Sequence, residues 1–182
     1  MFVYMFAYVQ DKMPGLDDTN AGRVVSVSFL ILNAVGAVLP ATILQPLTQR
    51  IGRVRTHYVS IGSMALVYAG IGLLGHSPMA LYLLMALLGI GWAATVSLPF
   101  AIMSQKVDQA RMGLYMGLFN LSVVLPQLVA SLGIGQAISQ AADKNLIFGL
   151  CAATLAISAI SWIFVAEPAN RVEGDQPPAS GH

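Results

Sequence analysis

The distribution of charge constrains this chain more than any other feature of its sequence. Aspartate, glutamate, lysine and arginine are absent from four long windows, at residues 24–49, 58–105, 112–142 and 145–166. Of all residues, 57% are apolar and 9% are charged, whereas about a quarter of a soluble domain is charged. A helix needs ~20 mainly apolar residues to cross the hydrocarbon layer of a membrane. Each window is long enough, so the sequence predicts an integral membrane protein that is all-α.

The second window has room for two helices. Its middle reads "GLLGHSPMALY", where Gly75, Ser77 and Pro78 favour a turn. We therefore expect five full membrane-spanning helices, at residues 24–48, 57–75, 79–104, 113–137 and 146–166.

The remaining segments are assigned from the same pattern. Residues 1–9, "MFVYMFAYV", are apolar but too few to cross a membrane, and they lack the flank and cleavage site of a signal peptide. We expect them to be the truncated end of a transmembrane helix. An extracytoplasmic loop is expected at 10–23 and the five-helix bundle at 24–166. Residues 167–182 are polar and rich in proline and glycine, which predicts a disordered cytoplasmic tail.

Lysine and arginine in the connections predict the orientation of the bundle. The connections around 50–56 and 105–112, together with the tail, carry six of them, and the opposite side carries three. The six are Arg50, Arg53, Arg55, Lys106, Arg111 and Arg171, and the three are Lys12, Arg23 and Lys144. We therefore expect a multi-pass protein of the cell (inner or plasma) membrane with its C-terminus in the cytoplasm.

The predicted spans contain no aspartate, glutamate, lysine or arginine, and the three histidines are assigned to loops or the terminus. The sequence also lacks a metal-ligand cluster and the motifs of hydrolases and nucleotide-binding proteins. Its net charge of +1 does not indicate nucleic-acid binding. These observations predict no enzyme, no cofactor, no metal and no nucleic-acid partner.

Neutral polar side chains within the spans are the candidate binding residues. Asn120 and Gln127 are seven residues apart, on one side of their helix. Trp92 and Thr95 share a face of another span, and Asn33 lies within the first. Taken singly, each is explained by a contact between helices, since small and polar residues favour such contacts. Together, three helices with uncharged polar residues near proline or glycine favour a path for a neutral, hydroxyl-rich solute.

Residues 91–136 carry a resemblance to a known family. "GWAATVSLPFAIMSQKVDQARMGLYMGLFNLSVVLPQLVASLGIGQ" resembles the tenth and eleventh helices of the glycoside–pentoside–hexuronide:cation symporter family. This family belongs to the major facilitator superfamily, and its sucrose and maltose transporter branch is the most similar. "LTQRIGRVRTH", residues 47–57, is similar to the basic loop between the eighth and ninth helices. The resemblance implies a C-terminal six-helix half: five full helices and the end of the seventh, without the N-terminal half.

The resemblance also implies a function. In this family sugar binds between the two halves, and the coupling carboxylate is expected in the N-terminal half. The implied activity is cation-coupled, proton-driven symport of a sucrose- or maltose-like α-glucoside by alternating access. By this resemblance Asn120 and Gln127 would face the central cavity, and Trp92 and Thr95 would line it too. As a separate expectation, the loops that carry Arg53, Arg55 and Arg111 would close the cytoplasmic side. A major facilitator carrier of another solute, such as a drug, and a membrane scaffold that transports nothing remain as alternatives.

Overall fold

The computed structural model of the protein describes residues 4–134 and 145–167, and within these ranges all regular structure is helical. The elements are α1 (Met5–Lys12), α2 (Asp18–Leu39), η2 (Pro40–Leu44), α3 (Gln45–Ile51), α4 (Arg53–Leu74), α5 (Pro78–Lys106), η3 (Gln109–Arg111), α6 (Met112–Val129), η4 (Ala130–Ile134) and α8 (Leu146–Ile163). The predicted all-α class is confirmed. Most of the expected tail and the last three residues of the expected 113–137 span lie outside the described residues.

Five helical stretches in the described ranges are long and apolar enough to cross a membrane. They are Asp18–Ile51, Arg53–Leu74, Pro78–Lys106, Gln109–Gly133 and Leu146–Ile163. The predicted number of spans is therefore confirmed.

The helices around the expected 10–23 loop extend beyond the predicted boundaries. Helix α1 continues to Lys12 and α2 begins at Asp18, so only residues 13–17 connect them. The Asp17 carboxylate accepts a hydrogen bond from the Asn20 amide at 2.7 Å and caps the start of α2. The predicted boundaries differ because the absence of charge indicates only the part of a helix that can cross lipid. The helix itself begins at its capping residue, which can lie outside the lipid.

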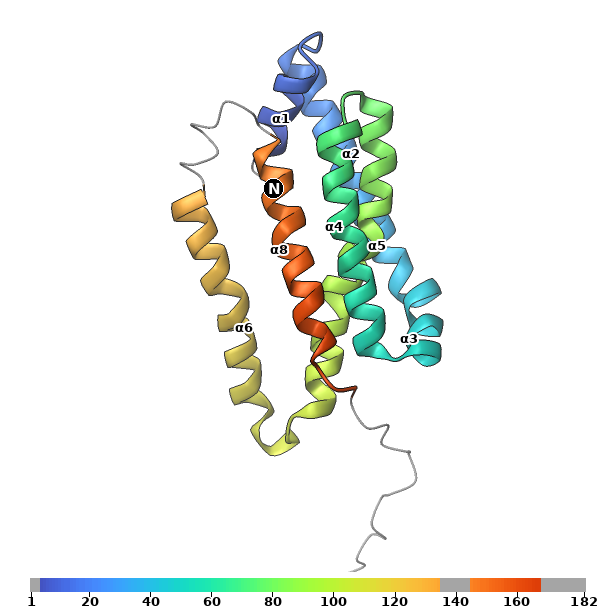
Figure 1. Ribbon diagram of the computed structural model, residues 1–182, viewed down its shortest axis with the longest axis vertical. Helices are drawn as coiled ribbons and strands as arrows, with labels where there is room; N and C mark the ends of the chain where they lie inside the picture. The colour runs from blue at the N-terminus through green and yellow to red at the C-terminus, as the bar shows by residue number, and fades with distance from the viewer. Residues whose placement is uncertain (1–3, 135–144, 168–182) are drawn as a thin grey trace, which may run out of the picture.

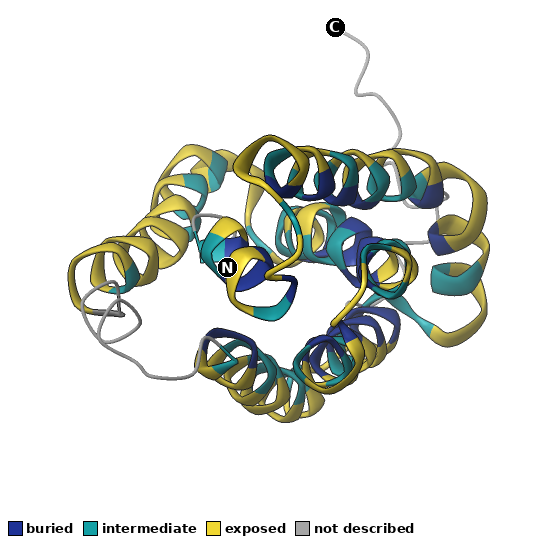
Figure 2. Cartoon of the chain, turned by 90° about the horizontal axis from the view of Figure 1, so that it is seen from above, coloured by how far each residue is buried: buried dark blue, intermediate teal, exposed yellow. Residues whose placement is uncertain are grey.

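Four long helices form the packed part of the molecule. Helix α4 packs against both α5 and α8, and α5 packs against α2. In Figure 1 these helices lie side by side, with α1 across one end and α6 standing apart. Figure 2 shows buried surface on the facing sides of the packed helices, whereas α6 is exposed along its length. Within the described residues, α6 has no buried side chain.

Two glycines of α5 allow helices to approach closely on opposite sides. A Cβ atom at Gly89 would lie 2.8 Å from the Val35 Cβ on α2, and one at Gly91 would lie 2.6 Å from the Met64 Cβ on α4. Residues two apart on a helix face nearly opposite directions, because one turn holds 3.6 residues. Helix α5 therefore contacts α2 and α4 at the same level of the bundle.

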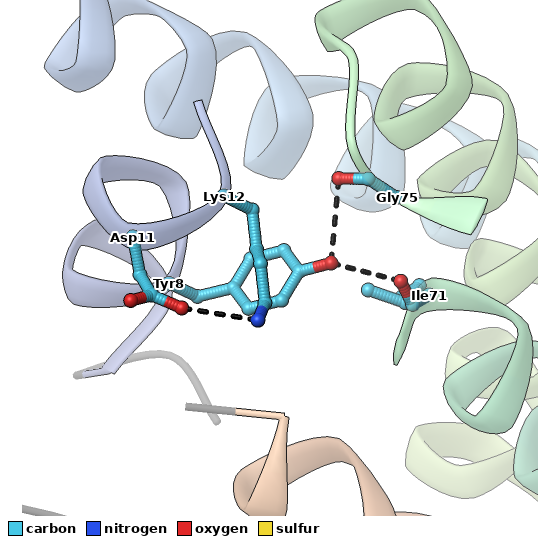
Figure 3. Close-up of polar contacts among 5 residues, drawn as sticks. All are labelled: Tyr8, Asp11, Lys12, Ile71 and Gly75. Atoms are coloured by element: carbon cyan, nitrogen blue, oxygen red, sulfur yellow. Dashed lines mark hydrogen bonds and ion pairs between the residues drawn. The ribbon is translucent and has the colours of Figure 1, made fainter. Parts of the chain in front are cut away.

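Helix α1 belongs to the core. Met5, Tyr8 and Val9 are fully buried. The Tyr8 hydroxyl donates hydrogen bonds to the Ile71 carbonyl at 2.8 Å and the Gly75 carbonyl at 3.3 Å (Figure 3). Its ring lies edge-on to Phe148 of α8, with centroids 4.5 Å apart. The apolar N-terminal residues therefore join the end of α4 to the start of α8.

Candidate functional site

Two of the predicted binding residues, Trp92 and Asn33, come from the crossing of α2 and α5. Thr95 also lies on α5, and its hydroxyl is 4.0 Å from the Met64 sulfur of α4. Trp92 is half-buried, and its Cδ1 lies 3.0 Å from the position of a Cβ at Gly36. Asn33 is one turn before Gly36 and exposed, and Thr95 is one turn after Trp92 and half-buried. The structure therefore places the indole of Trp92 within a helical turn of a polar side chain on each helix.

The hydrogen bonds at this crossing leave acceptor positions available. The Asn33 amide donates to the Phe29 carbonyl at 2.8 Å, which does not use its side-chain oxygen. The Thr95 hydroxyl donates to the Gly91 carbonyl at 2.9 Å and keeps its oxygen lone pairs. An amide oxygen and a hydroxyl oxygen beside an aromatic ring are suited to a ligand that carries both hydroxyl groups and an apolar face.

Asn120 and Gln127 lie on α6, away from this crossing. Both are exposed, and neither side chain makes a hydrogen bond to another described residue. The neighbour of Asn120, Phe119, contacts Phe100 of α5 with ring centroids 4.5 Å apart. The described residues bring neither amide to Trp92 or Thr95, so their role in sugar binding stays a prediction.

The three predicted gate arginines lie at one end of the bundle, where α3 meets α4 and where η3 joins α5 to α6 (Figure 1). Arg53 is half-buried, and its guanidinium donates to the Ala101 carbonyl of α5 at 3.4 Å. Arg55 and Arg111 are exposed. Arg53 therefore makes a contact within the bundle, whereas the other two side chains are accessible to a partner.

A polar cavity of about 470 Å³ opens at the same end. It is lined by Gln45, Thr48, Gln49, Gly52, Arg53, Gln105 and Glu167. The composition predicts that Glu167 belongs to a disordered tail. In the structure its carboxylate accepts hydrogen bonds from the amides of Arg53 and Val54. The sequence signal for this contact is an acidic residue shortly after the last span, at the same end of the bundle as the Gly52-Arg53 pair.

His57 also differs from the expectation. The expected position is in a loop, but His57 lies inside α4 and is 3% exposed. Its ring is edge-on to Trp162 of α8 with centroids 4.4 Å apart, and its Nδ1 has no hydrogen-bond partner among the described residues. Because α4 already begins at Arg53, its second turn carries His57 into the contact with α8. Within the described ranges no group of three or more metal-binding side chains occurs.

The fold and the polar crossing define a helical membrane protein with uncharged polar residues between its spans. The family model for the Major Facilitator Superfamily matches residues 1–131. This match covers more than half of the chain, so the protein belongs to the Major Facilitator Superfamily, a superfamily of transporters and not of enzymes. The resemblance at this level is confirmed.

Sucrose transport proteins are among the similar curated proteins. Sucrose transport protein SUC4 of Arabidopsis thaliana is 28% identical over 134 residues, which cover 64% of this chain and 26% of the relative. Sucrose transport protein SUT2 of Oryza sativa subsp. indica and that of subsp. japonica are each 41% identical over 51 residues, 27% of this chain and 10% of the relative. The chain thus spans about a quarter or less of these relatives. No solved structure matches it.

Proposed function

We propose that this chain forms the C-terminal half of a cation-coupled sugar symporter that takes up a sucrose- or maltose-like α-glucoside by alternating access. The similarity to SUC4, which extends over 134 residues, carries this proposal. The coupling cation is H⁺, and its carboxylate belongs to the N-terminal half, because the windows that cross the membrane here hold no acid. The partners are the sugar, the cation, the lipid bilayer and the N-terminal six-helix half.

The orientation follows from the arginine-rich end. Arg53, Arg55 and Arg111 face the cytoplasm in this proposal, and the protein resides in the cell membrane. Arg55 and Arg111 are exposed and contact the N-terminal half when the cytoplasmic side closes. Arg53 acts indirectly, because its side chain is already bonded to α5.

The sugar site has two parts in this half. The first is the α2–α5 crossing, where Asn33 and Thr95 present acceptor oxygens beside Trp92. The second is α6, where the side chains of Asn120 and Gln127 are exposed and can contact the sugar in the whole transporter. Amides donate and accept hydrogen bonds, as sugar hydroxyls do.

Uptake of labelled sucrose and maltose by the full-length transporter in proteoliposomes tests the proposal. We expect an inward proton gradient to drive uptake and an uncoupler to abolish it. Trp92→Ala should raise KM by a factor of about 10 or more, the order expected when a buried contact to the ligand is removed. Ser63→Ala, an exposed change on α4, is the control and should leave KM unchanged.

The variants Asn120→Ala and Gln127→Ala test the second part of the site. Each should raise KM for the sugar while the protein stays folded. Unchanged sugar uptake in both variants would remove them from the site. Transport of a lipophilic drug, with no uptake of either sugar under a proton or sodium gradient, would contradict the sugar symporter itself.

A further inference from the structure

The segment that follows α8 is bonded to the start of α4, more than 100 residues away. The first amides of a helix lack partners within the helix, and here the Glu167 carboxylate accepts from two of them. One oxygen bonds the Arg53 amide, and both lie 3.1–3.2 Å from the Val54 amide. An acidic group is favourable at this end of a helix because of the helix dipole.

Gly52 makes room for this carboxylate. A Cβ atom at Gly52 would lie 2.7 Å from the Glu167 carboxyl carbon and 2.8 Å from each of its oxygens. Its φ of +91° is also one that side-chain-bearing residues rarely adopt. Glycine at position 52 therefore allows both the positive φ between α3 and α4 and the close approach of the Glu167 carboxylate.

The Arg53 side chain makes a separate contact. In the described residues no ion pair joins its guanidinium to Glu167, and it donates to the Ala101 carbonyl of α5. The main chain at the start of α4 is thus joined to the end of α8, and the side chain is joined to α5. Val165 and Trp162 pack with Leu98 and Ile102 of α5 in one apolar cluster at this end.

We propose that residues 164–167, the strap, fasten the end of α8 to the start of α4, so that the arginine-bearing start of α4 and the neighbouring ends of α5 and α8 move as one block. The part of this proposal that concerns transport rests on the proposed function, because these helix ends move relative to the other half only in alternating access. The bonds of the strap do not depend on it. Breaking them should loosen the α3–α4 junction and slow transport without changing the affinity for sugar.

Limited trypsin digestion of the purified full-length protein tests the strap without any transport measurement. Arg50, Arg53 and Arg55 are cleavage sites at the α3–α4 junction, and Lys106 and Arg111 provide an internal reference outside the strap. In Glu167→Gln we expect cleavage at the junction to become about fivefold faster or more, as local opening becomes easier when a helix cap is lost. Cleavage at the reference sites should not change.

Truncations and a matched variant complete the design. Removal of residues 167–182 should reproduce the effect of Glu167→Gln, whereas removal of 168–182 and Glu173→Gln should digest like the natural protein. Gly52→Ala should accelerate cleavage less in a Glu167→Ala background than in the natural one, because the clash with the carboxylate is then absent. This comparison stays informative if one single variant is poorly folded.

Equal junction cleavage in Glu167→Gln and the natural protein would overturn the strap. Faster cleavage combined with a lower maximal rate of sugar uptake and an unchanged KM would support both proposals. Faster cleavage in a protein that carries no sugar at all would keep the strap and reject the sugar symporter.

Discussion

The helices α5 and α6 are neighbours in the chain and both qualify as membrane spans, yet they are packed very differently. Of the most apolar window of α5, 39% is buried inside the protein, compared with 0% for the span that contains α6. Both helices contain glycines and an internal proline. Gly91 of α5 lies against α4, whereas a Cβ atom at Gly117 of α6 would have no neighbouring heavy atom of the described residues within 4 Å.

This difference shows that insertion of a helix into a membrane and its packing against other helices are separate properties, which composition alone does not distinguish. An apolar sequence is sufficient for a helix to enter a membrane, because lipid is as apolar as leucine. Association of helices needs complementary shape, and α5 obtains it where glycine meets Val35 and Met64. In the described residues α6 has one aromatic contact, between Phe119 and Phe100, in place of such a surface.

The largest expected effect comes from adding one methyl group at Gly91. In Gly91→Ala the new Cβ would lie 2.6 Å from the Met64 Cβ and 2.9 Å from the Ser60 carbonyl oxygen. We expect a loss of about 2 kcal/mol in the free energy of unfolding, as in other overpacked cores. Thermal unfolding in detergent measures it. Gly117→Ala on α6 is the control, and it should leave the stability unchanged or raise it by up to about 1 kcal/mol, because alanine favours a helix over glycine. Equal losses in the two variants would contradict the difference between the helices.

A smaller effect is expected from Tyr8→Phe. This change removes the donor to the carbonyls of Ile71 and Gly75 in a fully buried position. The expected loss is about 1 kcal/mol, the usual net value of a buried hydrogen bond. The same unfolding measurement applies, with Tyr115→Phe on α6 as the matched change, because that hydroxyl bonds no described residue. An unchanged free energy of unfolding in Tyr8→Phe would show that the Tyr8 hydroxyl does not stabilise the packing of α1.

The smallest effect concerns the link between the two regions. Phe119→Ala removes the aromatic pair with Phe100, which is worth about 1 kcal/mol or less beyond its buried area. Distances between spin labels on α5 and α6 should become more widely distributed, while the unfolding temperature changes little. Leu118→Ala, an exposed neighbour, should leave the distribution as it is. An unaltered distribution in Phe119→Ala would mean that other contacts hold α6.

The spans could be predicted because the cost of burying charge in lipid is local and large. The site could be predicted only in part. Trp92 and Asn33 were chosen from separate helices, and no periodicity within one helix tells which neighbour it crosses. Glu167 is placed by its hydrogen bonds to the start of α4, and His57 is buried because it packs against Trp162 of α8. The sequence does not display either contact.

The sequence by itself determined how many times the chain can cross a membrane, and that its spans carry neutral polar groups in place of charged ones. Hydrophobicity is additive along a helix, so it can be summed from residue types. The tertiary structure decided which polar groups meet, namely Trp92 with Gly36 and Glu167 with Gly52. Such encounters depend on backbone approach to within a few ångströms between residues far apart in the chain, and that distance is a property of the packed bundle alone.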